Sequence, residues 1–254
     1  MIFSMIKKDW FTHVVKVFRQ KKTRKFLIIL LAIDLFFVPI HFIHSFTDSL
    51  NSDFFNIKTD LGLAESFGYL KWILCIFLLY KLRKIESSRL YYIWMVIFLY
   101  IWLDDMFRGH ERLGWHIANL LDGEVMGLRP QPAGEFLALM FSGLAILVAV
   151  GLSFFYGSKF FKKFSFGMIL IFFILGFFVI GLDAIHTMNS SDSNYDFWMG
   201  LLENGGEMLV SSFVVAYIYG TYHHRLRKWK RGSKDFKNIE IKSGWKNSTE
   251  EISF

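Results

Sequence analysis

The feature that most constrains this chain is a series of apolar runs, each about as long as a lipid bilayer is thick. An α-helix of roughly 20 apolar residues crosses the hydrocarbon core. In lipid, only helices and closed barrels satisfy all of their own backbone polar groups. The sequence therefore predicts an all-α, polytopic transmembrane helix bundle with six spans. The predicted spans are residues 26–45, 67–82, 90–109, 135–156, 165–187 and 197–222.

Composition supports this class and excludes several others. Hydrophobic residues make up 54% of the 254-residue chain, which is more than a soluble globular domain usually carries. The single cysteine, Cys75, lies inside an apolar run, so neither a disulfide framework nor a cysteine-based metal site is expected. The formal net charge of +7 could suggest nucleic acid as a partner. Its distribution along the chain indicates a membrane role instead, and no nucleic-acid partner is expected.

The positive charges predict the orientation of the six spans. Of the 29 Lys and Arg residues, 24 lie in the two tails and in the turns after the second and fourth spans. In this topology all of those segments lie on the same side of the membrane. Short loops rich in Lys and Arg stay in the cytoplasm. We therefore expect a multi-pass protein of the cytoplasmic (inner) membrane with both termini cytoplasmic. The remaining five lie on the opposite side or in its flanking helix ends: Lys58, Lys71, Arg108, Arg112 and Arg129.

The chain divides into three predicted parts. Residues 1–25 form a basic amphipathic cytoplasmic segment, 26–222 the six-span domain, and 223–254 a basic tail that is partly disordered. The apolar residues of the first segment share one helical face: Ile6, Trp10, Val14 and Val17. Such a helix suits the surface of the anionic cytoplasmic leaflet, so the bilayer is the expected partner of both tails. The alternative is a frayed basic tail that only sets the topology.

Ionisable residues inside the spans lie at similar heights. Such residues are costly in lipid and usually face a bundle interior or a wet cavity. Counted from the cytoplasmic end at about 1.5 Å per residue, Asp104 lies roughly 22 Å up and His41 about 23 Å. Glu207 lies about 24 Å and Asp183 about 28 Å up. These side chains predict a polar pocket between the first, third, fifth and sixth spans that opens to the non-cytoplasmic face.

Helical spacing adds neighbours to this pocket. His186 follows Asp183 by three residues, and Glu203 precedes Glu207 by four, so each pair shares a helical face. Arg108 and Glu111 lie four and seven residues after Asp104, so these three residues are also expected on one face. Asp34 lies deeper, about 12–13 Å up. It requires a partner such as Tyr or Arg across the bundle.

Carboxylates and imidazoles on facing helices suit Zn, or a carboxylate-rich Fe or Mn centre with hydrolase-like or redox activity. The sequence lacks a complete HExxH motif, because Gly114 stands where the second histidine would be. As general acids or bases we expect Asp104, His110, Glu111 and Glu207. The predicted metal ligands are His41, Asp104, His110, Asp183, His186, Glu203 and Glu207.

Two other functions remain open. Clustered Asp, Glu and His can relay protons, so the protein could be a proton- or ion-coupled transporter. Polar groups of comparable density are not evident in the cytoplasmic half, so the sequence shows no continuous path. Alternatively, the cluster could be a structural or partner-binding device that holds the helices together.

Three stretches also carry a family resemblance: "LDDMFRGHERLG", "LLENGGEML" and "NIKTDLGLAESFGYLK". Together they resemble an uncharacterised family of bacterial multi-pass membrane proteins. In that family an acidic pair followed by His-Glu ends one span, and a Leu-Glu…Glu-Met stretch opens the last span. The resemblance covers residues 50–220 and implies no activity. It implies a shared site of six residues: Asp104, Asp105, His110, Glu111, Glu203 and Glu207.

Overall fold

The computed structural model describes residues 2–250, apart from 48, 49, 51, 60, 122, 124, 126, 127 and 189–192. Its elements are helical: α1 (Ile2–Phe18), α2 (Lys21–Phe46), the 3-10 turn η1 (Asp53–Phe55), α3 (Leu63–Glu86), α4 (Tyr91–Phe107), α5 (Gly109–Ala118), α6 (Pro130–Tyr156), α7 (Lys159–Gly176), the π-helical segment η2 (Phe177–Leu182), α8 (Asp183–Met188) and α9 (Ser193–Glu250).

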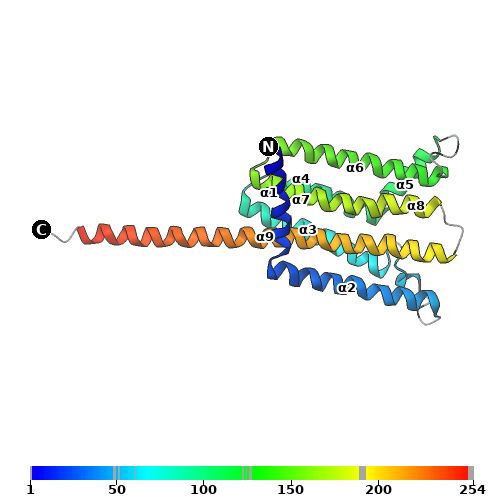
Figure 1. Cartoon of the computed structure of the whole chain (residues 1–254), viewed down its shortest axis with the longest axis horizontal. Helices are drawn as coiled ribbons and strands as arrows, with labels where there is room; N and C mark the ends of the chain where they lie inside the picture. The colour runs from blue at the N-terminus through cyan, green and yellow to red at the C-terminus, as the bar shows by residue number, and fades with distance from the viewer. Residues whose placement is uncertain are drawn as a thin grey trace.

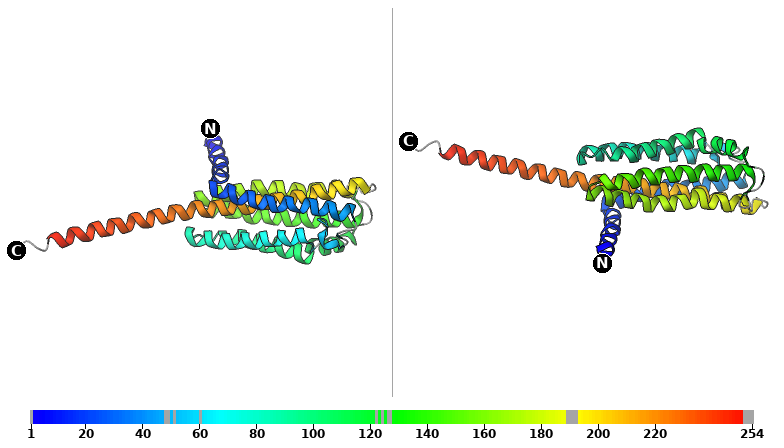
Figure 2. Two further views of the ribbon diagram at one scale, coloured as in Figure 1. Left: turned by 90° about the horizontal axis from the view of Figure 1, so that it is seen from below. Right: turned by 90° about the horizontal axis from the view of Figure 1, so that it is seen from above.

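The long helices lie side by side in one bundle. Helices α2, α3, α4, α6 and α7 run roughly parallel to the first half of α9 (Figure 1). The short helix α5 lies at one end of this bundle. Helix α1 lies across the other end, and the second half of α9 projects beyond it (Figure 2). The bundle thus has two chemically different ends, with the basic helix extension at one of them.

Four helical segments are long and apolar enough to cross a membrane: α2, α3, α6 and the continuous stretch Lys159–Thr187. Each of the six predicted apolar runs is helical, so the all-helical fold is confirmed. Helix α4 has only 17 residues, and α9 carries Glu203 and Glu207 in its apolar half. The two helices with the weaker membrane signature are therefore among those that present acidic groups to the interior.

The third predicted span ends earlier than expected. Helix α4 stops at Phe107, because Arg108 takes a left-handed conformation with φ 52° and ψ 46°. A new helix, α5, begins at Gly109. A Cβ atom at this glycine would lie 2.5 Å from Oδ1 of Asp104, so any other residue here would require the carboxylate to move. Asp104, Arg108 and Glu111 therefore do not lie on one continuous helix, although all three line the same cavity.

The predicted apolar face of the first segment packs against protein. Val14 and Val17 are buried, and the Trp10 ring lies 6.1 Å from Phe154 and 5.4 Å from Phe166. These phenylalanines belong to α6 and α7. The side chain of Ile6 lies outside the described side chains. Helix α1 thus closes one end of the bundle, and its apolar side stabilises the contact between neighbouring helices.

The last helix is longer than predicted. We expected the sixth span to end near residue 222 and the basic tail to be partly disordered. Helix α9 instead continues without interruption to Glu250. Its tail has no proline, and Lys and Arg are good helix formers when they face water. Residues 251–254 lie outside the described part of the chain.

A buried ion pair joins three helices near the centre of the bundle. Lys71 Nζ of α3 lies 2.6 Å from Asp34 Oδ1 of α2, and both side chains are 1% exposed. The ammonium group also donates to the carbonyl of Met208 (2.8 Å) and to Ser211 Oγ (3.2 Å) in α9. Ser212 Oγ donates to Asp34 Oδ2 over 2.6 Å. The predicted partner of Asp34 was Tyr or Arg; the partner is Lys71.

Removing one member of this pair leaves the other charge buried and unpaired. We expect Lys71→Met to lower the free energy of unfolding by about 3–5 kcal/mol. Denaturant unfolding of the detergent-purified protein measures this loss. The matched control is Lys58→Met, whose partner Asp196 has a side chain that is 45% exposed. It should cost less than about 1 kcal/mol. Equal effects of the two substitutions would contradict the assignment.

Candidate functional site

A cavity of about 590 Å³ lies inside the bundle, toward the end that carries α5 and α8. Its wall comes from α3 to α9 and from the loop before α3. Two cationic side chains, Lys58 and Arg108, and two imidazoles, His110 and His186, share it with a larger set of carboxylates. The acidic residues in the wall are Glu65, Asp104, Asp105, Glu111, Glu135, Asp183, Glu203 and Glu207.

The structure brings together all but one of the predicted site residues. The exception is His41, which does not line the cavity. Its ring is buried in α2 and stacks on Phe197 of α9, with centroids 5.0 Å apart and planes within 7°. His41 therefore faces α9 near the start of that helix and not the cavity. Helices α3 and α6 contribute to the cavity in place of α2.

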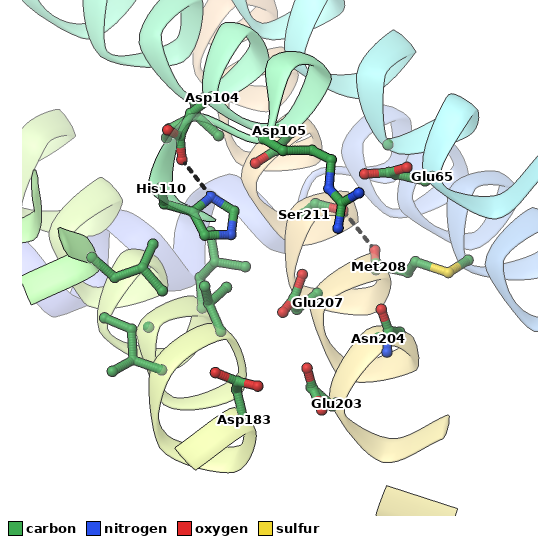
Figure 3. A pocket seen from close by; sticks show the side chains of 18 of the residues that line it. Glu65, Asp104, Asp105, His110, Asp183, Glu203, Asn204, Glu207, Met208 and Ser211 are labelled. Carbon is green, nitrogen blue, oxygen red and sulfur yellow. Dashed lines mark hydrogen bonds and ion pairs between the residues drawn. The ribbon is translucent and has the colours of Figure 1, made fainter. Parts of the chain in front are cut away.

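Asp104 and His110 form a paired unit at the junction of α4 and α5. His110 Nδ1 lies 2.9 Å from Asp104 Oδ2. Burial lowers the pKa of His110. The hydrogen bond to Asp104 and the charges of Asp104, Glu111 and Asp105 outweigh burial and raise the pKa above its ordinary value. The ring of His110 lies across the cavity from Asp183 and Glu207 (Figure 3).

Two glycines place α5, and with it His110, against α6. A Cβ atom at Gly114 would lie 2.7 Å from the backbone nitrogen of Glu135, and one at Gly134 would clash with the carbonyl oxygen of Gly114. The two helices therefore touch backbone to backbone, as small residues allow. This close approach brings Glu135 of α6 to the same cavity as the Asp104–His110 pair.

His186 stands between two carboxylates. Its Nδ1 lies 2.9 Å from Glu203 Oε2, and its Nε2 lies 3.0 Å from Asp196 Oδ1. Lys58 Nζ donates to the other oxygen of Asp196 over 2.6 Å. This hydrogen bond from Lys58 is the main reason why the pKa of Asp196 lies below its ordinary value. Both nitrogens of His186 are thus occupied, and a metal ion could bind the ring only by displacing a carboxylate.

Asp183 and Glu207 come from elements with unusual local structure. The π-helical segment η2 ends directly before Asp183. Such segments are rare and occur often at functional sites. In α9, Gly206 packs against the ring of Phe178 from η2, where a Cβ atom would overlap the ring. The close contact sets the two helices so that Asp183 faces Glu203 and Glu207 across the cavity (Figure 3).

Some cavity residues were missed or assigned another role. Glu65 lies in the first turn of α3 and Glu135 is the sixth residue of α6, so both look like ordinary span boundaries. Asp105 lies inside the third predicted span and belongs to the site that the family resemblance implies. Trp72 Nε1 donates to its carboxylate over 3.0 Å. Lys58 counted only toward the charge distribution. The sequence did indicate Glu135 as a candidate, because it is the one Asp, Glu, Lys, Arg or His residue between 130 and 156.

The carboxylates and imidazoles do not form a ready-made metal cage. Among the described residues, no group of three or more His, Cys, Asp and Glu side chains is positioned to hold a metal ion. The acidic groups line a space instead of converging on a point. Binding of a metal ion would therefore need rearrangement of these side chains around it.

Comparison with known families gives one match. The model of the domain of unknown function DUF8692 matches residues 23–221, so the chain belongs to this family. The match spans every cavity-lining segment, from α3 to the first half of α9. No curated protein and no solved structure matches the chain.

The raised pKa of His110 predicts a pH-dependent stability. An imidazole with a raised folded-state pKa stabilises the folded protein fully below its unfolded value of about 6.5. This contribution is lost as pH rises through the folded-state pKa. The melting temperature of the wild type should therefore fall between about pH 6 and 8 more than that of His110→Gln. Parallel melting curves for the two proteins would contradict the Asp104–His110 pair.

Proposed function

We propose that this DUF8692 protein spans the cytoplasmic membrane six times, with both termini in the cytoplasm and the cavity open to the opposite face. The support is the location of the basic residues. Helix α1 and the extension of α9, which together carry 12 of the 29 Lys and Arg residues, lie at the bundle end away from α5 (Figure 1). Anionic headgroups of the inner leaflet would attract both basic segments.

The proposed role of the cavity is to bind a cation from the non-cytoplasmic side. The observation that carries this proposal is the charge of the cavity wall, which holds eight carboxylates but only two cationic side chains. Of the two cations, Lys58 already pairs with Asp196 and Arg108 with Glu111 at the rim. A low-dielectric cleft lined by one sign of charge concentrates ions of the opposite sign.

A divalent metal ion, Zn, Fe or Mn, is the first candidate for this cation. His110, Asp183, Glu203 and Glu207 would hold it, with the side-chain rearrangement described above. Asp104 would orient the imidazole, as carboxylates commonly do for metal-bound histidines. The metal would supply Lewis-acid activation of a water molecule for hydrolase-like chemistry, or electron transfer in the case of Fe or Mn. Glu111 and Glu207 lie close enough to the same space to accept a proton.

Metal analysis of the purified protein tests this role. We expect about one equivalent of Zn, Fe or Mn per chain by inductively coupled plasma mass spectrometry, as in single-ion sites. Asp183→Asn combined with Glu207→Gln removes two ligand charges and should abolish the bound metal. The control is Asp9→Asn, which removes an exposed carboxylate paired with Lys163 at the other end of the bundle. Equal metal content in all three proteins, or none in any, would contradict a metal site.

Ion-coupled transport is a second candidate because one observation favours it. Ser211 lines the cavity and also accepts a hydrogen bond from Lys71, whose partner is Asp34. A polar chain thus continues from the cavity toward the centre of the bundle, deeper than the sequence suggested. Proton uptake by proteoliposomes, driven by a gradient of the bound cation, would support transport. A protein that binds no cation but loses stability in the Asp183→Asn/Glu207→Gln variant would support the structural role.

A further inference from the structure

The cavity has two chemically different halves. The carboxylates and imidazoles lie toward the end that carries α5 and α8. The wall on the other side of them is mostly apolar and comes from α4, α6, α7 and η2. Its apolar residues are Ile101, Leu139, Ile146, Phe172, Leu175, Val179 and Ile180, and the hydrogen-bonded pair Tyr100 and Ser142 lies among them. A site for a bare ion has no use for such an extended apolar wall, because ions bind to oxygen and nitrogen ligands.

Two helices give the same length for this apolar half. Along α6, Glu135 and Ile146 are eleven residues apart, and along α7–α8, Phe172 and Asp183 are also eleven apart. At about 1.5 Å per residue, each pair spans about 16 Å along the bundle. Both helices place the acidic residue at the outer end. The apolar half therefore extends from the acidic groups toward the middle of the membrane.

Three aromatic side chains of the wall lie close to its carboxylates. Tyr69, Trp72 and Tyr100 all line the cavity. Trp72 donates to Asp105, and the Tyr100 hydroxyl lies 2.7 Å from Ser142 Oγ, so hydrogen bonds hold both rings in place. Aromatic faces attract organic cations, and quaternary ammonium groups are commonly recognised in this way. A site with aromatic rings beside carboxylates thus favours an alkylammonium group over other cationic groups.

We propose that the cavity binds an amphiphile with a cationic amine head and a single apolar chain. The head lies among the carboxylates and the aromatic rings, and the chain fills the apolar half between α4, α6 and α7. Charge complementarity selects the head, because the wall carries eight acidic residues. The apolar half lies at membrane depth, which suits the apolar chain of the ligand, because a lipid-soluble ligand would approach from the bilayer. This inference rests on the cation-binding role proposed above, but not on the metal.

Binding of three probes to the full-length protein in amphipol tests the proposal by isothermal titration calorimetry. Dodecyltrimethylammonium has both head and chain, tetramethylammonium has the head alone, and dodecyl sulfate has the chain with an anionic head. We expect saturable binding of the first, at least about tenfold tighter than of the second, because chain methylene groups leave water. The anionic probe should bind at least about tenfold more weakly than the cationic one, because like charges repel.

Two substitutions on α6 locate the chain. Ile146→Trp fills the inner half and should weaken dodecyltrimethylammonium binding by more than about tenfold, as overfilled sites resist a ligand. Tetramethylammonium binding should stay unchanged. Leu147→Trp is the matched control, since Leu147 is 47% exposed on the outside of the bundle. It should leave all three affinities unchanged. Leu139→Trp blocks the same half nearer the carboxylates and replaces Ile146→Trp if that variant does not fold.

The outcomes separate this inference from the proposed function. Equal affinities for dodecyltrimethylammonium and tetramethylammonium, or no effect of both blocking substitutions, would overturn the amphiphile and leave a cation site. Binding of neither tetramethylammonium, dodecyltrimethylammonium nor Zn²⁺ would overturn the cation-binding role and the amphiphile together. Tight binding of dodecyltrimethylammonium without any bound metal would support the amphiphile and exclude the metal site.

Discussion

The cost of placing charge in lipid governs the arrangement of this protein. An ionised side chain that faces hydrocarbon is strongly unfavourable, so each one within a span needs a partner or a polar cavity. Asp34 and Lys71 form an ion pair at the bundle centre. Lys71 also donates a hydrogen bond to α9, and Asp34 accepts one from α9. The acidic residues of the other helices face a shared space. Helix rotations are therefore set by where the charges point as well as by apolar packing.

Close backbone contacts make this arrangement possible. Gly109 admits the Asp104 carboxylate, Gly114 and Gly134 join α5 to α6, and Gly206 admits Phe178. Each glycine removes a side chain at a point where the cavity wall must bend or where two helices must touch. The result is a wall in which residues far apart in sequence, such as Glu65 and Glu207, meet.

The heights of the site residues could be predicted from the sequence, because helical rise is fixed at about 1.5 Å per residue. Asp104, Asp183 and Glu207 indeed meet in one cavity. The rotation of each helix could not be predicted, and His41 therefore turned out to stack on Phe197. The break at Arg108 was also hidden, since the left-handed residue there is an arginine and not a glycine. Lys71 looked like a topological charge, although its partner lies on another helix.

Topology labelling tests the central claim, that the cavity opens on the non-cytoplasmic face, most directly. Cys75 is buried in the core, so a membrane-impermeant maleimide does not reach it and single cysteines can be introduced elsewhere. Leu120, at the end of α5, is 82% exposed, and Trp229, in the extension of α9, is 57% exposed. In intact cells, a membrane-impermeant maleimide should label Leu120→Cys and reach Trp229→Cys only after the membrane is opened. The reverse pattern would place the cavity in the cytoplasm and contradict the account.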